Sequence, residues 1–377
     1  MDGPRTTPYR AVDTMTKQQS FKERVRARMA KTGERYTTAR AQILGTMARE
    51  ASPSNGHAFR PGLCRDTAAV TNVLAAAGVR LAPGGASVDE VLLTGLCGGT
   101  CFLYVVFEYK GWPPLPSVLM RFDTAADRFA LQGLRRLGLG LEVSETSSAA
   151  KADRSLDEAL DAGHAVLCVV GGSVPAEGAA LDPVAAMAPM IVAVISREGD
   201  DYVVDSGSGR PERRSRAALA AARAGYKPAK RRMAVLRAPG EVGDAREALH
   251  GALADTAQRY EVAPYKGFAS NFGLAGMQKF VDALTDTKDK RGWPRLFPEG
   301  KRAAIGLRRL YQGLELEMTP PAGGRGVQAQ FLRAAAEHTG HRAYADVARG
   351  FDAAAAAWSE VSGFVAGCGV REVRMGC

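Results

Sequence analysis

The sequence contains few cysteines and no long apolar run. Six cysteines occur in 377 residues, too few for a disulfide scaffold, so we expect reduced thiols. No stretch approaches the roughly 18 uncharged apolar residues that a membrane-spanning helix needs. Residues 1–17 hold no apolar signal core, so we expect a cytoplasmic protein that does not act in a membrane.

Charge is unevenly distributed along an otherwise ordinary globular composition. The formal net charge is +10. Residues 17–49 hold nine basic and two acidic residues, a net charge of +7, so the rest of the chain is nearly neutral. Such a segment suits an acidic partner: an acyl carrier protein or, as a second choice, nucleic acid. The other interpretation is a solvated helical face.

Hydrophobic periodicity divides the chain into three regions. Residues 1–62 are predicted to form a basic helical arm and a linker rich in Ser, Pro, Gly and Asn. Residues 63–239 begin with a predicted helix, 67–77, and continue mainly with strands. Residues 240–377 have helical periodicity throughout. A helix followed by strands and then a helical region predicts an α+β protein.

Cys64 is the strongest candidate for a reactive side chain. It follows the turn Pro61-Gly62 and immediately precedes the predicted helix. A helix N-terminus stabilises a thiolate, and Arg65 adds a positive charge nearby. The residue type and its position therefore suit a nucleophile. The alternative is a small buried core residue.

A second cysteine pair brackets two glycines. Cys97 and Cys101 flank Gly98 and Gly99, but a zinc ribbon needs a closer pair and a second pair of ligands. We expect no metal and no cofactor. The glycines predict a tight turn or a place where a substrate backbone approaches.

Several stretches together resemble the butirosin biosynthesis protein H family, papain-like acyltransferases. They are LCRDTAAVTNVLAAAGV (63–79), LTGLCGGTCFLYVVFEY (93–109), LDAGHAVLCVV (160–170), MIVAVISREGDDYVVDSG (190–207) and RAALAAARAGYKPAKRRMAVL (216–236). GFASNFGLAGMQKFVDAL (267–284) and residues 314–340 resemble the helical domain of unknown function that commonly follows in that family.

The resemblance implies a papain-like domain followed by an all-helical domain, with a cysteine, a histidine and an acid as catalytic residues. Cys64 would be the nucleophile, and Asp205, at the end of the second hairpin strand, the orienting acid. Met190 stands where the family pattern has histidine, so the base must come from elsewhere. His164, at the start of a predicted strand, is our candidate; His57, seven residues before the cysteine, is the other.

The implied function is acyl or aminoacyl transfer in specialised metabolism. The cysteine would take an acyl group from a carrier-protein thioester and pass it to a small-molecule amine. Gly98, Gly99 and Met190 are the expected substrate-binding residues. Two alternatives stay open: a related cysteine hydrolase or peptidase, and a non-catalytic binding protein that keeps the fold without the histidine.

Overall fold

The computed structural model describes residues 56–64, 66–82, 85–119, 121, 126–171, 189–236, 242–318 and 320–375. The chain divides into two compact units, Met1–Pro53 and Ser54–Cys377. The basic segment 17–49 lies outside the described residues. Residues 54–377 pack as a single unit. The predicted domain boundary at 239/240 stays a prediction.

The second unit contains both strands and helices. The strands are β1 Leu103–Phe107, β2 Leu115–Leu119, β3 Leu141–Ser144, β4 Val166–Val170, β5 Met190–Glu198, β6 Asp201–Asp205, β7 Glu212–Ser215 and β8 Met233–Leu236. The helices are α3 Ala68–Ala76, α4 Glu90–Leu96, α5 Ala126–Arg136, α6 Ala149–Asp161, α8 Arg216–Gly225, α9 Ala245–Glu261, α10 Gly273–Thr285, α11 Trp293–Leu296, α12 Lys301–Glu315, α13 Arg325–Thr339 and α14 Ala343–Met375. The predicted α+β class with a helical C-terminal region is confirmed.

Six strands form one antiparallel sheet in the order β3-β8-β4-β5-β6-β7. The hairpin predicted from its two apolar runs is present as β5 and β6. Its turn contains Gly199, whose φ of 63° suits a residue without a side chain. This hairpin supplies two of the central strands and ends at Asp205, so it fixes where that carboxylate lies.

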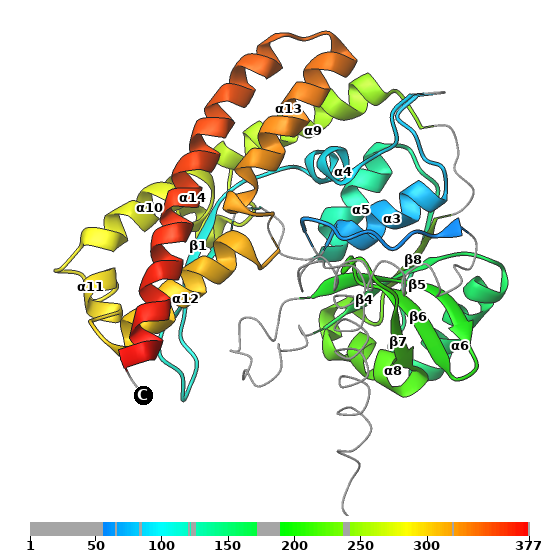
Figure 1. Cartoon of the computed structure of the whole chain (residues 1–377), viewed down its shortest axis with the longest axis horizontal. Coiled ribbons are helices and arrows are strands. Elements are labelled where there is room, and N and C mark those ends of the chain that lie inside the picture. The colour runs from blue at the N-terminus through cyan, green and yellow to red at the C-terminus, as the bar shows by residue number, and fades with distance from the viewer. Residues whose placement is uncertain are drawn as a thin grey trace, which may run out of the picture. The chain divides into compact units, whose positions relative to one another are not determined.

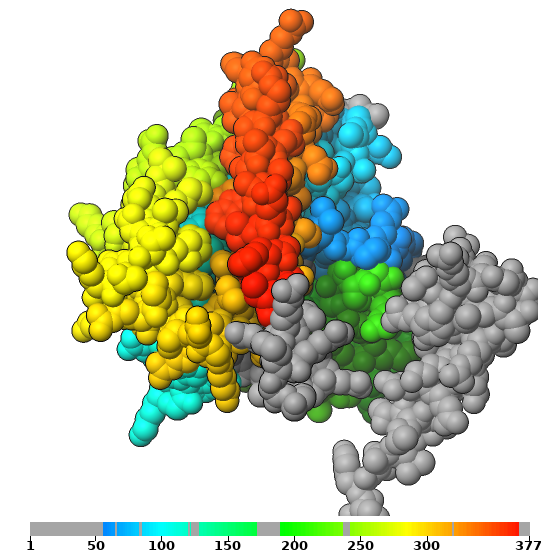
Figure 2. All heavy atoms as spheres, turned by 60° about the vertical axis from the view of Figure 1, so that its left-hand side comes forward, coloured from blue at the N-terminus to red at the C-terminus, as the bar shows by residue number. Residues whose placement is uncertain are grey.

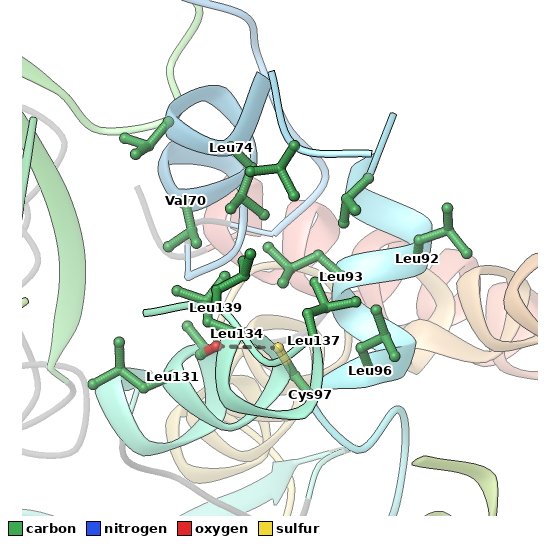
Figure 3. Close-up of a cluster of buried hydrophobic side chains, with 14 of the residues drawn as sticks. Val70, Leu74, Leu92, Leu93, Leu96, Cys97, Leu131, Leu134, Leu137 and Leu139 are labelled. Carbon is green, nitrogen blue, oxygen red and sulfur yellow. Dashed lines mark hydrogen bonds between the residues drawn. The ribbon is translucent and has the colours of Figure 1, made fainter. Parts of the chain in front are cut away.

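The two faces of the sheet carry separate apolar cores because successive side chains of a strand point to opposite faces. On one face, Ile191 and Ala193 pack with residues of α3, α4 and α5. On the other, Val192 and Val194 pack with residues of α6 and α8. In Figure 1, α3 and α5 lie above the sheet, and α6 and α8 lie below it. Figure 3 shows the core around α3, α4 and α5, with Cys97 directed toward a backbone oxygen of α5.

The β1–β2 hairpin belongs to the helical side of the molecule, although it precedes the six-stranded sheet in sequence. Phe102 and Tyr104 pack with Phe280 of α10 and Leu314 of α12 in a third core, and β1 lies beside these helices in Figure 1. α14 runs along the surface of this side (Figure 2). The N-terminal and C-terminal regions of the unit are therefore interleaved.

Glycines allow two of these contacts to be close. A side chain at Gly95 of α4 would lie 2.1 Å from the ring of Phe331 on α13. A side chain at Gly313 of α12 would lie 2.2 Å from the carbonyl oxygen of Val118 on β2. Within the described residues, every helix is too short or too polar to cross a bilayer.

Replacing Gly313 should separate α12 from the hairpin. We expect Gly313→Ala to lower the free energy of unfolding by about 1–3 kcal/mol, because its methyl group meets backbone that cannot move aside. The control is Gly350→Ala in α14, where nothing lies within 4 Å and helix propensity favours alanine by roughly 0.5–1 kcal/mol. Thermal melts measure both. Equal melting temperatures for the two variants would contradict the packing argument.

Candidate functional site

Cys64 lies in the turn that leads into α3. Its carbonyl oxygen accepts hydrogen bonds from the backbone N–H groups of Thr67 and Ala68, at 3.1 and 2.9 Å. The turn thus continues into the helix, as the sequence predicted. Before it, Pro61 forms a bridge with Ser208, and the Gly62 N–H donates to the Gly207 carbonyl at 3.1 Å. The segment before the cysteine is therefore held along the loop that follows β6.

A carboxylate on α4 holds the same turn. Glu90 accepts hydrogen bonds from the N–H groups of Leu63 and Cys64, at 2.6 and 2.8 Å, and from the hydroxyl of Thr67 at 2.9 Å. Asp89 caps α4 by accepting from the Leu92 N–H at 2.8 Å. The two adjacent acidic residues thus have different roles: Asp89 caps the N-terminus of α4, and Glu90 binds the turn before α3.

The thiol of Cys64 is buried, and this overturns the expectation of a low pKa. The residue is 2% exposed. The pKa of the Cys64 thiol is raised to about 11, chiefly by burial and next by the Asp66 carboxylate. The Arg121 guanidinium and a hydrogen bond from the Asp66 N–H act in the opposite direction but do not compensate. Arg65, from which we expected a favourable charge, lies outside the described residues.

A buried ion pair lies beside the thiol. Arg121 Nη1 is 2.6 Å from Asp66 Oδ2, and both side chains are almost inaccessible to solvent. The guanidinium also lies over the ring of Phe129, 4.5 Å from its centroid. This pair keeps one negative and one positive charge near Cys64, and their effects on the pKa of the thiol oppose each other.

Asp205 ends β6 and is fully buried. Its Oδ2 accepts from His57 Nε2 at 2.8 Å and from Asn72 Nδ2 at 2.9 Å, and its Oδ1 accepts from the Gly207 N–H at 2.7 Å. Asn72 lies on α3 and also donates to the Arg60 carbonyl at 2.9 Å. The carboxylate therefore joins the strand end, the helix and the segment that precedes Cys64.

His57 is the histidine that the structure places at the predicted orienting acid. An ionised carboxylate only accepts hydrogen bonds, so Nε2 carries the hydrogen, and in the neutral imidazole the lone pair is then on Nδ1. The Nδ1 atom is buried and has no hydrogen-bond partner among the described residues. Phe59 packs against the ring edge-to-face at 4.9 Å. A histidine oriented by an aspartate, with a free basic nitrogen, is the arrangement that a general base requires.

The structure corrects the choice of His164. That residue follows α6, and its N–H donates to the Ala159 carbonyl at 3.0 Å. Among the described residues, the Asp205 carboxylate accepts hydrogen bonds from His57, Asn72 and Gly207 instead. The sequence signal for His57 was its spacing of seven residues from Cys64 across a turn, which lets the chain fold back.

Met190 does not occupy a vacant histidine position. It pairs with Val170 at the start of β5, whereas the residue opposite Asp205 is Ala193. Met190 packs with the core between the sheet and helices α6 and α8. Ala193 and α3 belong to the core on the other face of the sheet. The interpretation that Met190 stands at the histidine position of the catalytic site is therefore wrong. Alternation along β5 is the reason, since Met190 and Ala193 are three positions apart and an odd offset places their side chains on opposite faces.

The two glycines of the candidate substrate site pack against the C-terminal helices. Gly98 and Gly99 have φ values of 109° and 59°, which favour glycine. A side chain on Gly98 would lie 1.6 Å from Arg259 of α9, and one on Gly99 would lie 2.2 Å from Gln328 of α13. The close approach that we expected is thus made by protein side chains. Substrate binding by this pair stays a prediction.

The thiol and the imidazole are not hydrogen-bonded to each other in this structure: His57 Nε2 is bound to Asp205, and its Nδ1 has no partner among the described residues. Asn72, in the second turn of α3, shares the Asp205 oxygen with His57. No hydrogen bond joins the described atoms of Cys64 and His57. The site therefore consists of a buried thiol near the start of α3 and a histidine–aspartate pair beside its second turn.

Two family comparisons cover most of this unit. Residues 64–173 match the family described as butirosin biosynthesis protein H, N-terminal, and residues 217–374 match a domain of unknown function, DUF4872. Both matches agree with the sequence resemblance to the butirosin biosynthesis protein H family and to the helical domain that follows in it. The first match begins at Cys64, while His57 and Asp205 lie outside both matched ranges.

Other comparisons add little. A solved structure of a C39-like peptidase from Bacillus anthracis is 12% identical, covers 50% of this chain and 98% of its own, and has a TM-score of 0.33. That likeness is too weak to carry an argument. Comparison with curated proteins finds no match.

The raised pKa predicts slow alkylation of Cys64. At about pH 7, a thiol with a pKa of about 11 is ionised in roughly one molecule in ten thousand, and burial blocks the reagent. We expect iodoacetamide to label the half-buried Cys368 before Cys64 in folded protein, with Cys64 labelling increasing as pH rises toward about 10. Peptide mass mapping measures the order. Earlier labelling of Cys64 at neutral pH would mean that the thiol is exposed or ionised in solution.

Loss of the Asp205 charge should destabilise the fold. We expect Asp205→Asn to lower the free energy of unfolding by about 1.5–3 kcal/mol, because an amide cannot accept all the bonds from His57, Asn72 and Gly207. The control is Asp161→Asn, whose side chain is 63% exposed in a surface pair with Arg197 and should change stability by less than about 0.5 kcal/mol. Urea titration measures both. A neutral Asp205→Asn variant would disprove the network's structural role.

Proposed function

We propose that this protein is a cysteine-dependent acyltransferase that moves an acyl group from a carrier-protein thioester to an amine. The observation that carries the proposal is Cys64 at the start of α3, with its backbone bound by Glu90 and the Asp66 N–H directed at its sulfur. The family match that begins at Cys64 supports it. The sequence resemblance to the butirosin biosynthesis protein H family implies acyl chemistry at this cysteine.

The first step forms a thioester on the enzyme. The Cys64 sulfur attacks the carbonyl carbon of the donor thioester, its proton passes to a base, and the bond from that carbon to the carrier sulfur breaks. The carrier leaves as a thiol after receiving a proton. The acyl group is now attached to Cys64, and no redox change occurs.

The second step transfers the acyl group to the acceptor. The nitrogen of the amine attacks the carbonyl carbon of the acyl-enzyme and loses a proton. The bond to the Cys64 sulfur breaks, the thiol is restored, and the product is an amide. If water replaces the amine, the product is a carboxylic acid, which is the reaction of the alternative hydrolase or peptidase.

His57 is our candidate for the base. Asp205 holds its neutral tautomer and leaves Nδ1 free to accept a proton. Asn72 donates to the same carboxylate oxygen and so helps to orient it. No hydrogen bond joins the thiol and the imidazole, so the proposal requires the Cys64 side chain to rotate toward His57 when the donor binds, while its backbone stays in place.

The carrier protein and the amine acceptor are proposed partners. The net charge of +7 in residues 17–49 suits an acidic carrier, since electrostatic attraction speeds the encounter of oppositely charged proteins. Nucleic acid is the alternative acidic partner. Increasing salt would weaken the binding of either partner.

Burial of Cys64 favours a second candidate function. A thiol that is 2% exposed with a pKa of about 11 is also what a structural cysteine looks like. On this alternative the protein binds a ligand or partner and catalyses nothing. Acylation of Cys64 distinguishes the two candidates.

Intact-protein mass tests the acyltransferase proposal. After incubation with acyl-pantetheine thioesters, which present the donor group without the carrier protein, we expect one added acyl group that maps to Cys64. Cys64→Ala should lose it and the control Cys368→Ala should keep it. His57→Gln should slow acylation by roughly 10²-fold, the contribution of a general base.

Three results would change this assignment. No adduct on the wild-type protein, with or without a purified acyl carrier protein, would favour the binding protein. An adduct that forms equally in Cys64→Ala would be non-specific. Rapid release of free acid in the presence of amines would favour the hydrolase.

A further inference from the structure

We infer that Glu90 is the positioning residue of Cys64: it holds the backbone of the reactive turn in place from a neighbouring helix. This inference rests on the proposed role of Cys64. Sequence reasoning did not select Glu90, which lies 26 residues from the cysteine.

The geometry is specific to the cysteine turn. One carboxylate oxygen, Oε2, accepts from the Leu63 N–H at 2.6 Å, and the other, Oε1, accepts from the Cys64 N–H at 2.8 Å. Oε1 also accepts from the Thr67 hydroxyl at 2.9 Å. All three donors belong to the five residues that lead into α3. These N–H groups precede the first intrahelical hydrogen bonds of α3, so they need acceptors from outside the helix, and Glu90 supplies them.

The attachment restrains the backbone without restraining the sulfur. Thr67 Oγ1 is 3.3 Å from the Cys64 carbonyl oxygen, and Gly62 packs so closely that a side chain there would lie 2.7 Å from Glu90 Oε2. None of these contacts involves the thiol. The turn is thus fixed at its N–H groups, while rotation about the Cα–Cβ bond of Cys64 can still redirect the sulfur.

The carboxylate also affects the charge state of the thiol. Its negative charge is one of the causes that favour the protonated form of Cys64, together with burial and Asp66. Removing Glu90 therefore changes both the order of the turn and the pKa of the thiol. The turn becomes less ordered, while the thiol becomes easier to ionise.

The test compares Glu90→Ala with Glu90→Gln. In Glu90→Ala the turn opens more often, so we expect Cys64 alkylation by iodoacetamide to become at least about tenfold faster, the equivalent of one lost hydrogen bond to a charged group. Acylation by acyl-pantetheine should become at least about tenfold slower, because that step needs an oriented sulfur. Glu90→Gln keeps one acceptor oxygen for Cys64 and Thr67 and should give intermediate values for both rates.

The control is Glu247→Ala. Glu247 also lies in the first turn of an aspartate-capped helix, is exposed, and is far in sequence from the cysteine turn. It should leave both rates within about twofold of wild type. Melting temperatures of all variants identify any general loss of stability.

The two readouts separate this inference from the proposed function. If Cys64 is not acylated in wild type, the proposed function fails, yet faster alkylation in Glu90→Ala than in Glu90→Gln, which lacks the same charge, would still assign the positioning role. If alkylation and acylation in Glu90→Ala both stay within about twofold of wild type, Glu90 does not position Cys64. If Glu90→Ala does not fold, the same comparison is made with Glu90→Gln, and unchanged rates there overturn the inference.

Discussion

Asp205 is a fully buried carboxylate, and its need for hydrogen-bond donors organises the site. An ionised carboxylate without donors is very unfavourable in the interior of a protein. The donors come from three separate parts of the chain: His57 before the cysteine turn, Asn72 on α3 and the Gly207 N–H after β6. One interaction therefore attaches the segment that contains Cys64 to the sheet and places a histidine next to α3.

The same burial that stabilises the site suppresses its reactivity. Cys64 lies at a helix start, where the peptide dipoles favour a thiolate, yet desolvation dominates and raises the pKa of the thiol to about 11. The Glu90 and Asp66 carboxylates act in the same direction. If the protein is an acyltransferase, its resting thiol is protected, and donor binding must supply both exposure and a base. At rest, Glu90 holds the backbone of Cys64, and the sulfur is buried with the Asp66 N–H directed at it.

Interleaving of the helical side with the sheet side makes the C-terminal helices part of the site's support. Phe331 of α13 packs directly on Gly95 of α4, the helix whose first residue is Glu90. Arg259 and Gln328 fill the space beside Gly98 and Gly99 just beyond the end of that helix. The position of Glu90 thus depends on residues that lie more than 160 positions later in the chain. Through this packing, the C-terminal helices α9 and α13 support the helix that binds the cysteine turn.

The sequence by itself determined the α+β class, the helix that follows Cys64, the β5–β6 hairpin that ends at Asp205 and the helical C-terminal region. These features depend on local periodicity and turn residues, which neighbours in sequence reveal. Only the tertiary structure decided which histidine meets Asp205, because His57 and His164 are both at plausible distances along the chain. Strand register likewise decided that Met190 faces the core with α6 and α8. Alternation in the sequence shows which residues of a strand share a face, but not which helices that face contacts. The sequence could not predict the high pKa of Cys64 either. Desolvation depends on how completely distant segments of the chain cover the thiol, whereas the neighbouring residues indicate only that a helix starts there.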